Sequence, residues 1–183
     1  MKSRAVASLL SLIAAGTLAG LPSSLHAEEP AAKPLKVGPL SFSLTAPWKL
    51  SDKQSPMSQG TIELPGKDGA RGLTATFFHF GSGQGGDLAG NIKRWQGMFQ
   101  AAPEPKQEEF EFGKAKATLI SLSGTYVGSR FSPEPEPRTG YTLVAAVLPS
   151  SEGDIYVRLV GPEAAVTAAK EDFKKLLLTA AAK

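Results

Sequence analysis

The stretch of sequence that decides the fold runs from residue 141 to residue 178 and reads YTLVAAVLPSSEGDIYVRLVGPEAAVTAAKEDFKKLLL. Two apolar segments, 141–148 and 154–160, are joined in it by five residues that include a proline and a glycine. A connection this short predicts an antiparallel pair of strands, because parallel neighbours need a crossover of about a dozen residues or more. A helix is predicted after Gly161-Pro162, since apolar residues then recur every three or four positions, at Val166, Ala169, Phe173 and Leu176.

The sequence upstream of this stretch contains more strands and one further helix. Period-two alternation and β-branched or aromatic residues predict strands at 40–44, 58–64, 73–80, 107–112 and 114–127. The helix that interrupts them has Asp87 as its N-cap and an apolar face formed by Leu88, Ile92, Trp95 and Phe99. Consecutive strands with short connections favour antiparallel pairing, so the predicted fold is of the α+β class: a largely antiparallel β-sheet covered by helices.

Residues 130–140 are expected to interrupt the strands as an exposed loop. They contain Pro133, Pro135 and Pro137, and proline lacks the N–H group that a strand inside a sheet must donate. Glutamates separate the prolines. This composition indicates an extended spacer or, as the alternative, a docking peptide for a partner.

The N-terminus has the pattern of a cleavable export signal. Lys2 and Arg4 precede an uncharged segment, 5–21, and Ala27 supplies a small residue before the expected cut. We therefore predict that residues 1–27 are a signal peptide and that the protein is exported, to the periplasm or outside the cell. An uncleaved membrane anchor and a cut a few residues away are the alternatives. The uncharged segment is short for a membrane span, and no span is expected after cleavage.

The remaining chain is predicted to be a short leader and one domain. Residues 28–37 carry two prolines and several charges, which indicates a flexible leader. Residues 38–183 are long enough for a single α+β domain with its own core. The sequence has no cysteine, so an exported domain of this kind must be stabilised by packing rather than by disulfides.

The charge of the chain argues against a nucleic-acid partner. The full sequence has 20 basic and 17 acidic residues, and cleavage at residue 27 removes only Lys2 and Arg4, which leaves 18 basic residues. The mature chain is then close to neutral, and its lysines and arginines are dispersed. A nucleic-acid-binding domain needs a clustered basic surface.

The end of the chain resembles a known fold family. The residues that carry the resemblance are the segment 156–162, YVRLVGP, and the late Phe173 of the following helix. With an export signal and a sheet interrupted by one helix, they resemble the PsbP-like α/β/α sandwich proteins over roughly residues 38–178. Residues 83–86 and 91–95 are also similar to a pattern in small exported bacterial proteins of unknown function. The resemblance implies a fold rather than an activity, and no metal or photosystem-contact residue of PsbP can be matched here.

The glycine-rich segment 81–86 is the most suggestive motif. Its glycines match the spacing of a dinucleotide-binding turn, but that turn works only in a parallel β-α-β unit, whereas this sheet is predicted to be antiparallel. No cofactor is therefore expected. Two interpretations of the segment remain. It is a connector, or it is a loop whose backbone amides bind an anion at the N-terminus of the helix. The candidate ligand-binding residues are Gly83, Gly85, Gly86, Asn91 and Arg94; Asn91 could instead hydrogen-bond the loop, and Arg94 could be a solvated surface residue.

Catalytic and metal-binding patterns are not found in the sequence. His79 is the only histidine after residue 27, and neither a Gly-x-Ser-x-Gly motif nor a metal-ligand spacing is present. We therefore predict no catalytic residue, no metal and no cofactor. The expected function is a non-enzymatic binding or accessory role with an unidentified protein or small molecule as partner.

The alternative function is an enzyme or small-anion binder that uses residues 81–86 and the adjoining helix. An open, polar pocket at this loop, with Arg71, His79 or Arg94 directed into it, would favour an enzyme or a ligand-binding protein. A loop packed flush against the domain would favour a protein-interaction module.

Overall fold

The computed structural model describes residues 33–66 and 70–181. The predicted signal peptide, residues 1–27, lies outside the described residues. Within them, the main sheet has the strand order β3-β4-β5-β9-β8-β7-β6, and every neighbouring pair is antiparallel. Its strands are β3 (Lys49–Leu50), β4 (Gly60–Leu64), β5 (Leu73–His79), β6 (Lys106–Phe112), β7 (Ala115–Ser129), β8 (Ser132–Leu148) and β9 (Ile155–Pro162). The α+β class predicted from the sequence is confirmed.

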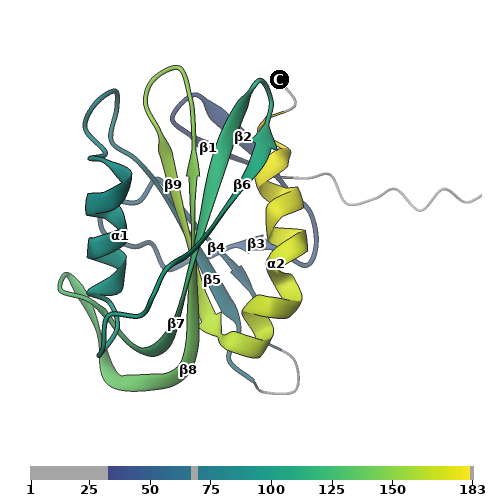
Figure 1. The fold of residues 1–183 in the computed structure, drawn as a ribbon. Helices are drawn as coiled ribbons and strands as arrows, with labels where there is room; N and C mark the ends of the chain where they lie inside the picture. The colour runs from purple at the N-terminus through teal and green to yellow at the C-terminus, as the bar shows by residue number, and fades with distance from the viewer. Residues whose placement is uncertain (1–32, 67–69, 182–183) are drawn as a thin grey trace, which may run out of the picture.

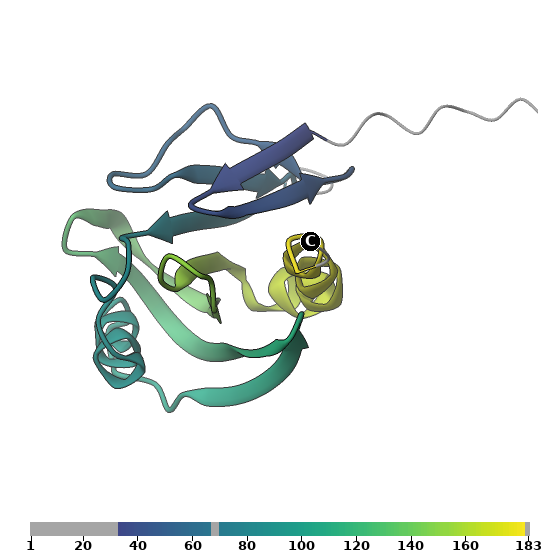
Figure 2. The ribbon, with the colours of Figure 1, turned by 90° about the horizontal axis from the view of Figure 1, so that it is seen from above.

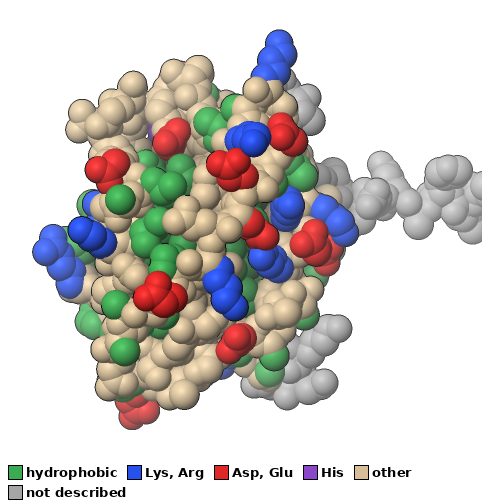
Figure 3. All heavy atoms as spheres, in the orientation of Figure 1, with side chains coloured by type: hydrophobic (Ala, Val, Ile, Leu, Met, Phe, Trp, Pro, Cys, Tyr) green, Lys and Arg blue, Asp and Glu red, His purple; other side chains and the backbone are tan. Residues whose placement is uncertain are grey.

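The two helices lie on opposite faces of the sheet (Figure 1). Helix α1 (Leu88–Gln96) covers one face, and helix α2 (Glu163–Leu178) lies against the concave side of the other, beside the hairpin of β1 (Lys33–Val37) and β2 (Leu40–Leu44) (Figure 2). The outer surface over α2 and β6 carries charged side chains of both signs (Figure 3). The sheet therefore separates two cores, one under each helix.

The segment 141–178 folds as its sequence predicts. Strands β8 and β9 form a hairpin in which Leu148 faces Ile155, and α2 follows β9 directly. The predicted apolar face of α2 is buried, and Phe173 is fully enclosed with its ring centroid 6.1 Å from that of Trp48. Helix α1 is shorter than predicted, because Gly97 caps it before Phe99.

The predicted flexible leader is wrong for its last five residues. Lys33–Val37 form β1, in which the buried Leu35 and Val37 alternate with the exposed Pro34 and Lys36. The two apolar side chains join the core on the α2 face, which compensates for the proline on the exposed side. Residues 28–32 of the predicted leader lie outside the described residues.

The prediction that residues 130–140 form a loop without strand pairing is also wrong. Strands β7 and β8 stay paired to the end of their hairpin, with Arg138 opposite Tyr126 and Pro133 opposite Gly128, across shifts of register. Strand β9 pairs with β8 only from Tyr141 onward, so the other edge of this part of β8 has no neighbouring strand. Proline is tolerated there because no ladder hydrogen bond is lost on the open edge. The predicted exposure of the three prolines is confirmed.

Candidate functional site

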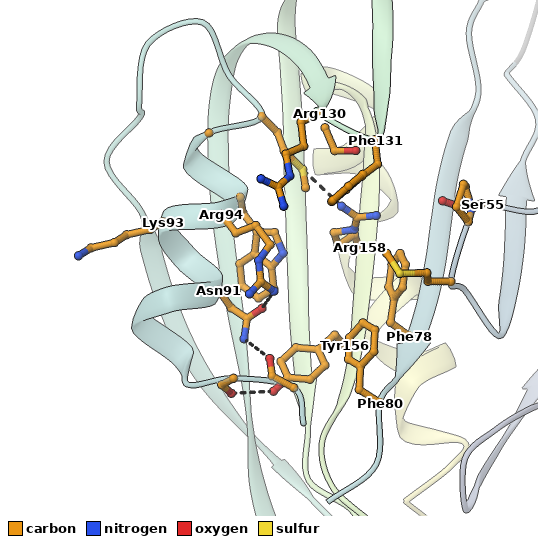
Figure 4. Close-up of a pocket in the computed structure, with 18 of the residues that line it drawn as sticks. Ser55, Phe78, Phe80, Asn91, Lys93, Arg94, Arg130, Phe131, Tyr156 and Arg158 are labelled. Carbon is orange, nitrogen blue, oxygen red and sulfur yellow. Dashed lines mark hydrogen bonds between the residues drawn. The ribbon is translucent and has the colours of Figure 1, made fainter. Parts of the chain in front are cut away.

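A cavity of about 710 Å³ lies between α1 and the sheet. Its walls come from α1, from β5 and β9, from the tip of the β7–β8 hairpin and from the connection between β3 and β4 (Figure 4). The end of the glycine-rich segment borders it through Gln84, Gly85 and Gly86. Of the two alternatives considered for this loop, a pocket or a flush packed surface, the structure has the pocket.

Asn91 connects the glycine-rich segment to α1. Its side chain is only 3% exposed, and its Nδ2 donates to the carbonyl oxygens of Gly85 and Asp87, both at 2.9 Å. The predicted hydrogen bond between Asn91 and the loop is confirmed. The amide oxygen, Oδ1, accepts a hydrogen bond of 2.8 Å from Nη1 of Arg94. Arg94 is exposed, as the alternative of a solvated surface residue predicted, and it is held at the cavity wall by a side chain that the loop itself fixes.

The N-terminus of α1 already has an acidic partner. Oδ1 of Asp87 accepts a hydrogen bond of 2.6 Å from the backbone N–H of Gly90, as an N-cap does. A carboxylate at this position satisfies the helix end and repels a second anion. The N-terminus of α1 is therefore poorly suited to bind an anion. The expectation that the loop amides bind one is not supported here.

The glycines of the segment differ in their surroundings. A Cβ atom on Gly85 would lie 2.4 Å from the hydroxyl oxygen of Tyr156, so only glycine fits there without displacing the tyrosine. That hydroxyl donates to the carbonyl oxygen of Gly86 at 3.2 Å. Gly83 is surrounded by open space and does not line the cavity. The structure therefore brings together four of the five predicted residues, Gly85, Gly86, Asn91 and Arg94.

The dinucleotide reading of the segment is excluded by topology. Strand β5, which precedes the glycines, pairs with β4 and β9, and both pairs are antiparallel. The strand after α1 is β6, at the far edge of the sheet. The parallel β-α-β unit that a dinucleotide turn requires is not formed.

The most informative residue of the cavity, Arg158, was missed in the sequence. It lies on β9 between Thr76 of β5 and Ala145 of β8, and its side chain is directed into the cavity (Figure 4). Its guanidinium carbon is 4.5 Å from the ring centroid of Phe78, and its Nη1 is 3.4 Å from the sulfur of Met98. A single arginine within the apolar run of β9 was the available signal, because charged residues are rarely placed in a central strand without a specific role.

Arg158 is a largely buried cation without an acidic partner in the described residues. Burial lowers the pKa of its guanidinium; Tyr126 opposes this shift, and the nearby Arg94 adds to it. The ion pairs formed among residues 33–66 and 70–181 are elsewhere: Glu109–Lys116, Glu134–Arg138, Glu108–Lys170 and Asp172–Lys175. Buried charges are normally paired, since leaving water costs several kcal/mol for an ion. The pairing that Arg158 lacks can come from an anion in the cavity.

Two further cations contribute to the positive character of the cavity. Arg94 is directed inward from α1, and Arg130 at the hairpin tip lies 4.5 Å from the ring centroid of Phe131, whereas Lys93 borders the cavity but points away from it (Figure 4). Among the described residues, the lining includes no aspartate and no glutamate. The local field therefore favours a negatively charged ligand.

The rim of the same cavity is apolar. Of the four large apolar side chains that are exposed in the described part of the chain, three line it: Met57 at 67%, Phe80 at 41% and Phe131 at 63%. The fourth, Leu50, does not. Exposed apolar groups gathered around one cavity indicate a binding surface rather than the scatter normal for a protein exterior.

Two residues considered from the sequence have other positions. His79 forms a 3.0 Å hydrogen bond through Nε2 with the carbonyl oxygen of Glu152, and it does not line the cavity. Arg71 borders a separate, smaller depression beside Arg138 and Pro162. Across residues 33–66 and 70–181, no group of three or more metal-ligating side chains occurs, and no helix is long and apolar enough to span a membrane.

The fold has counterparts among solved structures, although no known protein family and no curated protein matches the sequence. PsbP from the cyanobacterium Synechocystis matches with a TM-score of 0.51 and 15% identity, over 90% of this chain and 95% of that chain. A protein of unknown function from Pseudomonas aeruginosa matches with a TM-score of 0.46 and 12% identity, over 81% of this chain and 95% of that chain. Identities this low describe the fold and not the activity. The chain therefore has a PsbP-like α+β fold.

Proposed function

We propose that this protein is an exported, non-enzymatic domain that binds a small organic anion in the cavity between α1 and the sheet. The observation that carries the proposal is the largely buried guanidinium of Arg158, which faces the cavity and has no carboxylate partner among the described residues. The inward-facing Arg94 lies close enough to affect it electrostatically. An anion bound between the two could form ion pairs with both guanidinium groups.

The energetic argument rests on desolvation. A guanidinium has five N–H donors, and for Arg158 the described contacts are one N–H to a sulfur atom and the face of one aromatic ring. A carboxylate, sulfonate or phosphate group can accept parallel hydrogen bonds from two of the free N–H groups. Such charge-assisted pairs are among the strongest hydrogen bonds in proteins. The cost of burying Arg158 is then offset when the ligand is bound.

Binding is favoured over catalysis by the kinds of side chain that line the cavity. In the described part of the chain these are cations, aromatic rings, methionines, amides, glycines, one proline and the serines Ser55 and Ser129, with no carboxylate and no imidazole that could act as a general base. The hydroxyl of Tyr156 is committed to Gly86, and burial raises its pKa, with Asp154 adding to the shift. Such a lining can bind and orient an anion.

Export is supported by the sequence of residues 1–27, and it is tested separately from binding. N-terminal sequencing of the protein recovered from the cell envelope or the medium should give a start at or near Glu28. A chain that still begins with Met1 would contradict the export part of the proposal while leaving the binding part intact.

Binding is tested by calorimetry with 2-naphthoate, an aromatic carboxylate, as the probe. Arg158→Met keeps a flexible, unbranched side chain, two atoms shorter, and removes the charge, so it should lower the affinity by about tenfold or more. Arg71→Gln is the matched control, because it removes an arginine that does not line the cavity, and it should leave the affinity unchanged. Equal affinities for the wild type and Arg158→Met would reject Arg158 as the anion-binding group.

A further inference from the structure

The cavity has two chemically different parts. Its floor carries the guanidinium of Arg158, and the wall beside it carries Arg94. Its rim carries the exposed side chains of Met57, Phe80 and Phe131. A simple inorganic anion would use only the first part and would leave the apolar rim in water.

The cationic part is preorganised for an acidic head group. Arg94 is fixed by its hydrogen bond to Asn91, which the carbonyl groups of Gly85 and Asp87 hold in turn. Arg158 is fixed by the ring of Phe78 on one side and by the sulfur of Met98 on another. Two positioned cations, with no acid among the described residues of the lining, give a defined place for one negative group at little cost in side-chain ordering.

The apolar part is built largely from aromatic rings. The rings of Phe78 and Phe80 are nearly parallel, at 18°, with centroids 6.1 Å apart, and Phe80 lies 6.2 Å from the ring of Tyr156. Phe131 also contributes a ring, from the hairpin tip (Figure 4). Aromatic faces pair favourably with other aromatic rings in offset or edge-to-face arrangements. This lining therefore suits a flat ring better than a flexible acyl chain.

The rim also includes the only non-glycine residue with positive φ among the described residues. Met57, in the connection between β3 and β4, has φ of 61° and an exposed side chain beside the cavity. A long, unbranched residue rarely adopts this conformation without a compensating gain, and such strain is concentrated at binding sites. Methionine side chains adapt their shape to the surface of a ligand. Met57 is thus suited to cover a bound ring.

We propose that the ligand is an aromatic anion, in which one acidic group binds Arg158 and Arg94 and the attached ring system packs against Phe80, Tyr156 and Phe131. This inference rests on the proposed function and specifies its ligand class. The cavity volume of about 710 Å³ lies within the range of small-molecule sites and accommodates a ligand of one or two fused rings. Such a ligand contacts the cationic part and the aromatic part of the cavity at the same time. A neutral ring or an inorganic anion would contact only one of them favourably.

Four probes separate the two halves of the ligand. Calorimetric titrations should use 2-naphthoate (ring and charge), 2-naphthol at neutral pH (ring without charge), sulfate (charge without ring) and decanoate (charge with an acyl chain). The affinity for 2-naphthoate should exceed that for sulfate by roughly 100-fold, because the ring buries apolar area that sulfate lacks. It should also exceed the affinities for 2-naphthol and decanoate by about tenfold.

Two variants assign each half to its residues. Phe131→Ala should weaken 2-naphthoate and 2-naphthol alike, by about fivefold to tenfold, and should leave sulfate unchanged. Arg158→Met should weaken 2-naphthoate and sulfate and leave 2-naphthol unchanged. Leu50→Ala is the matched control for Phe131→Ala, because Leu50 is a similarly exposed apolar residue, at 45%, that does not line the cavity.

The outcomes distinguish this inference from the function on which it rests. If 2-naphthoate binds through Arg158 but sulfate binds as tightly and Phe131→Ala has no effect, the ring contributes nothing to affinity: the cavity still binds an organic anion, so the proposed function stands, and the aromatic ligand is rejected. If decanoate binds more tightly than 2-naphthoate, the apolar body is an acyl chain, and the inference is likewise overturned. If no probe binds at ~5 mM, the weak end of specific association, both proposals fail.

Discussion

The two faces of the sheet differ in what lies between the sheet and the helix that covers it. On one face α2 buries Val166, Ala169, Phe173, Leu176 and Leu177 in a continuous apolar core, with no charged side chain among its buried residues. On the other face the buried residues of the shorter α1 are Asn91 and Trp95, and a cavity with a largely buried arginine remains beside it. The α2 face is therefore expected to supply most of the free energy of unfolding. The α1 face is expected to contribute less, because it keeps a binding cavity.

The largest effect should come from the anchor of the α2 face. Phe173→Ala removes a fully buried ring and should lower the free energy of unfolding by about 3–5 kcal/mol. Thr167→Ala is the control on the exposed side of the same helix and should change it by less than ~0.5 kcal/mol. Urea or guanidinium melts measure both. If the two variants shift the midpoint equally little, α2 is not packed on the sheet, and the contrast between the faces disappears.

The next effect tests the polar anchor of the α1 face. Asn91→Leu removes the side-chain donors to Gly85 and Asp87 and the acceptor for Arg94. The carbonyl of Gly85 loses this partner, whereas that of Asp87 still accepts from the backbone N–H of residue 91. We expect a loss of about 2 kcal/mol, below that of Phe173→Ala, because a few hydrogen bonds rather than a core ring are lost. Lys93→Ala, at an exposed position of the same helix, is the control. If Asn91→Leu lowered the free energy of unfolding as much as Phe173→Ala, the two faces would contribute equally to stability.

Arg158→Met should raise the stability of the unliganded protein. Removing a largely buried charge that has no acidic partner in the described chain relieves its desolvation cost, and methionine retains contact with the ring of Phe78. A gain of about 1 kcal/mol, seen as a higher melting temperature without ligand, is expected together with the loss of affinity. A variant that is clearly less stable than the wild type would indicate that Arg158 is a structural residue.

The smallest effect should come from the hairpin extension. Replacing residues 133–137 with a Gly/Ser linker of equal length removes the ion pair between Glu134 and Arg138 but no buried apolar group. The cost should be less than about 1 kcal/mol, or roughly 2–4 °C in melting temperature for a domain of this size. A drop of more than ~8 °C would mean that the paired extension of β7 and β8 is needed for folding.

The same contrast between faces explains what the sequence could predict. The α2 face follows local rules: the spacing of Val166, Ala169, Phe173 and Leu176 gives the helix and its buried side, and the burial of these residues is confirmed. The α1 face depends on tertiary contacts. Asn91 and Arg94 were found because they adjoin the glycine-rich segment, whereas Met57, Arg130 and Phe131 come from distant parts of the chain, and only folding brings them to the cavity.

The remaining errors have physical causes that involve proline. Lys33–Val37 and the region 130–140 were predicted to be unpaired because they contain proline, yet the first forms β1 and the second, apart from the turn at 130–131, belongs to β8. In each strand the prolines lie at exposed positions, and β8 has an open edge along this part of its length. Whether a strand lies at an edge is a property of the whole sheet, and the local sequence does not encode it.

The measurement that tests the central claim most directly is side-chain NMR of the arginine Nε–H groups during titration with 2-naphthoate. If the cavity on the α1 face binds the anion through Arg158, the resonances of Arg158 and Arg94 should shift in a saturable way and gain protection from exchange with water, since each forms a charge-assisted hydrogen bond to the ligand. The resonance of Arg71, outside the cavity, should stay unchanged. Saturable binding that leaves Arg158 unshifted, or that shifts Arg71 instead, would contradict the account.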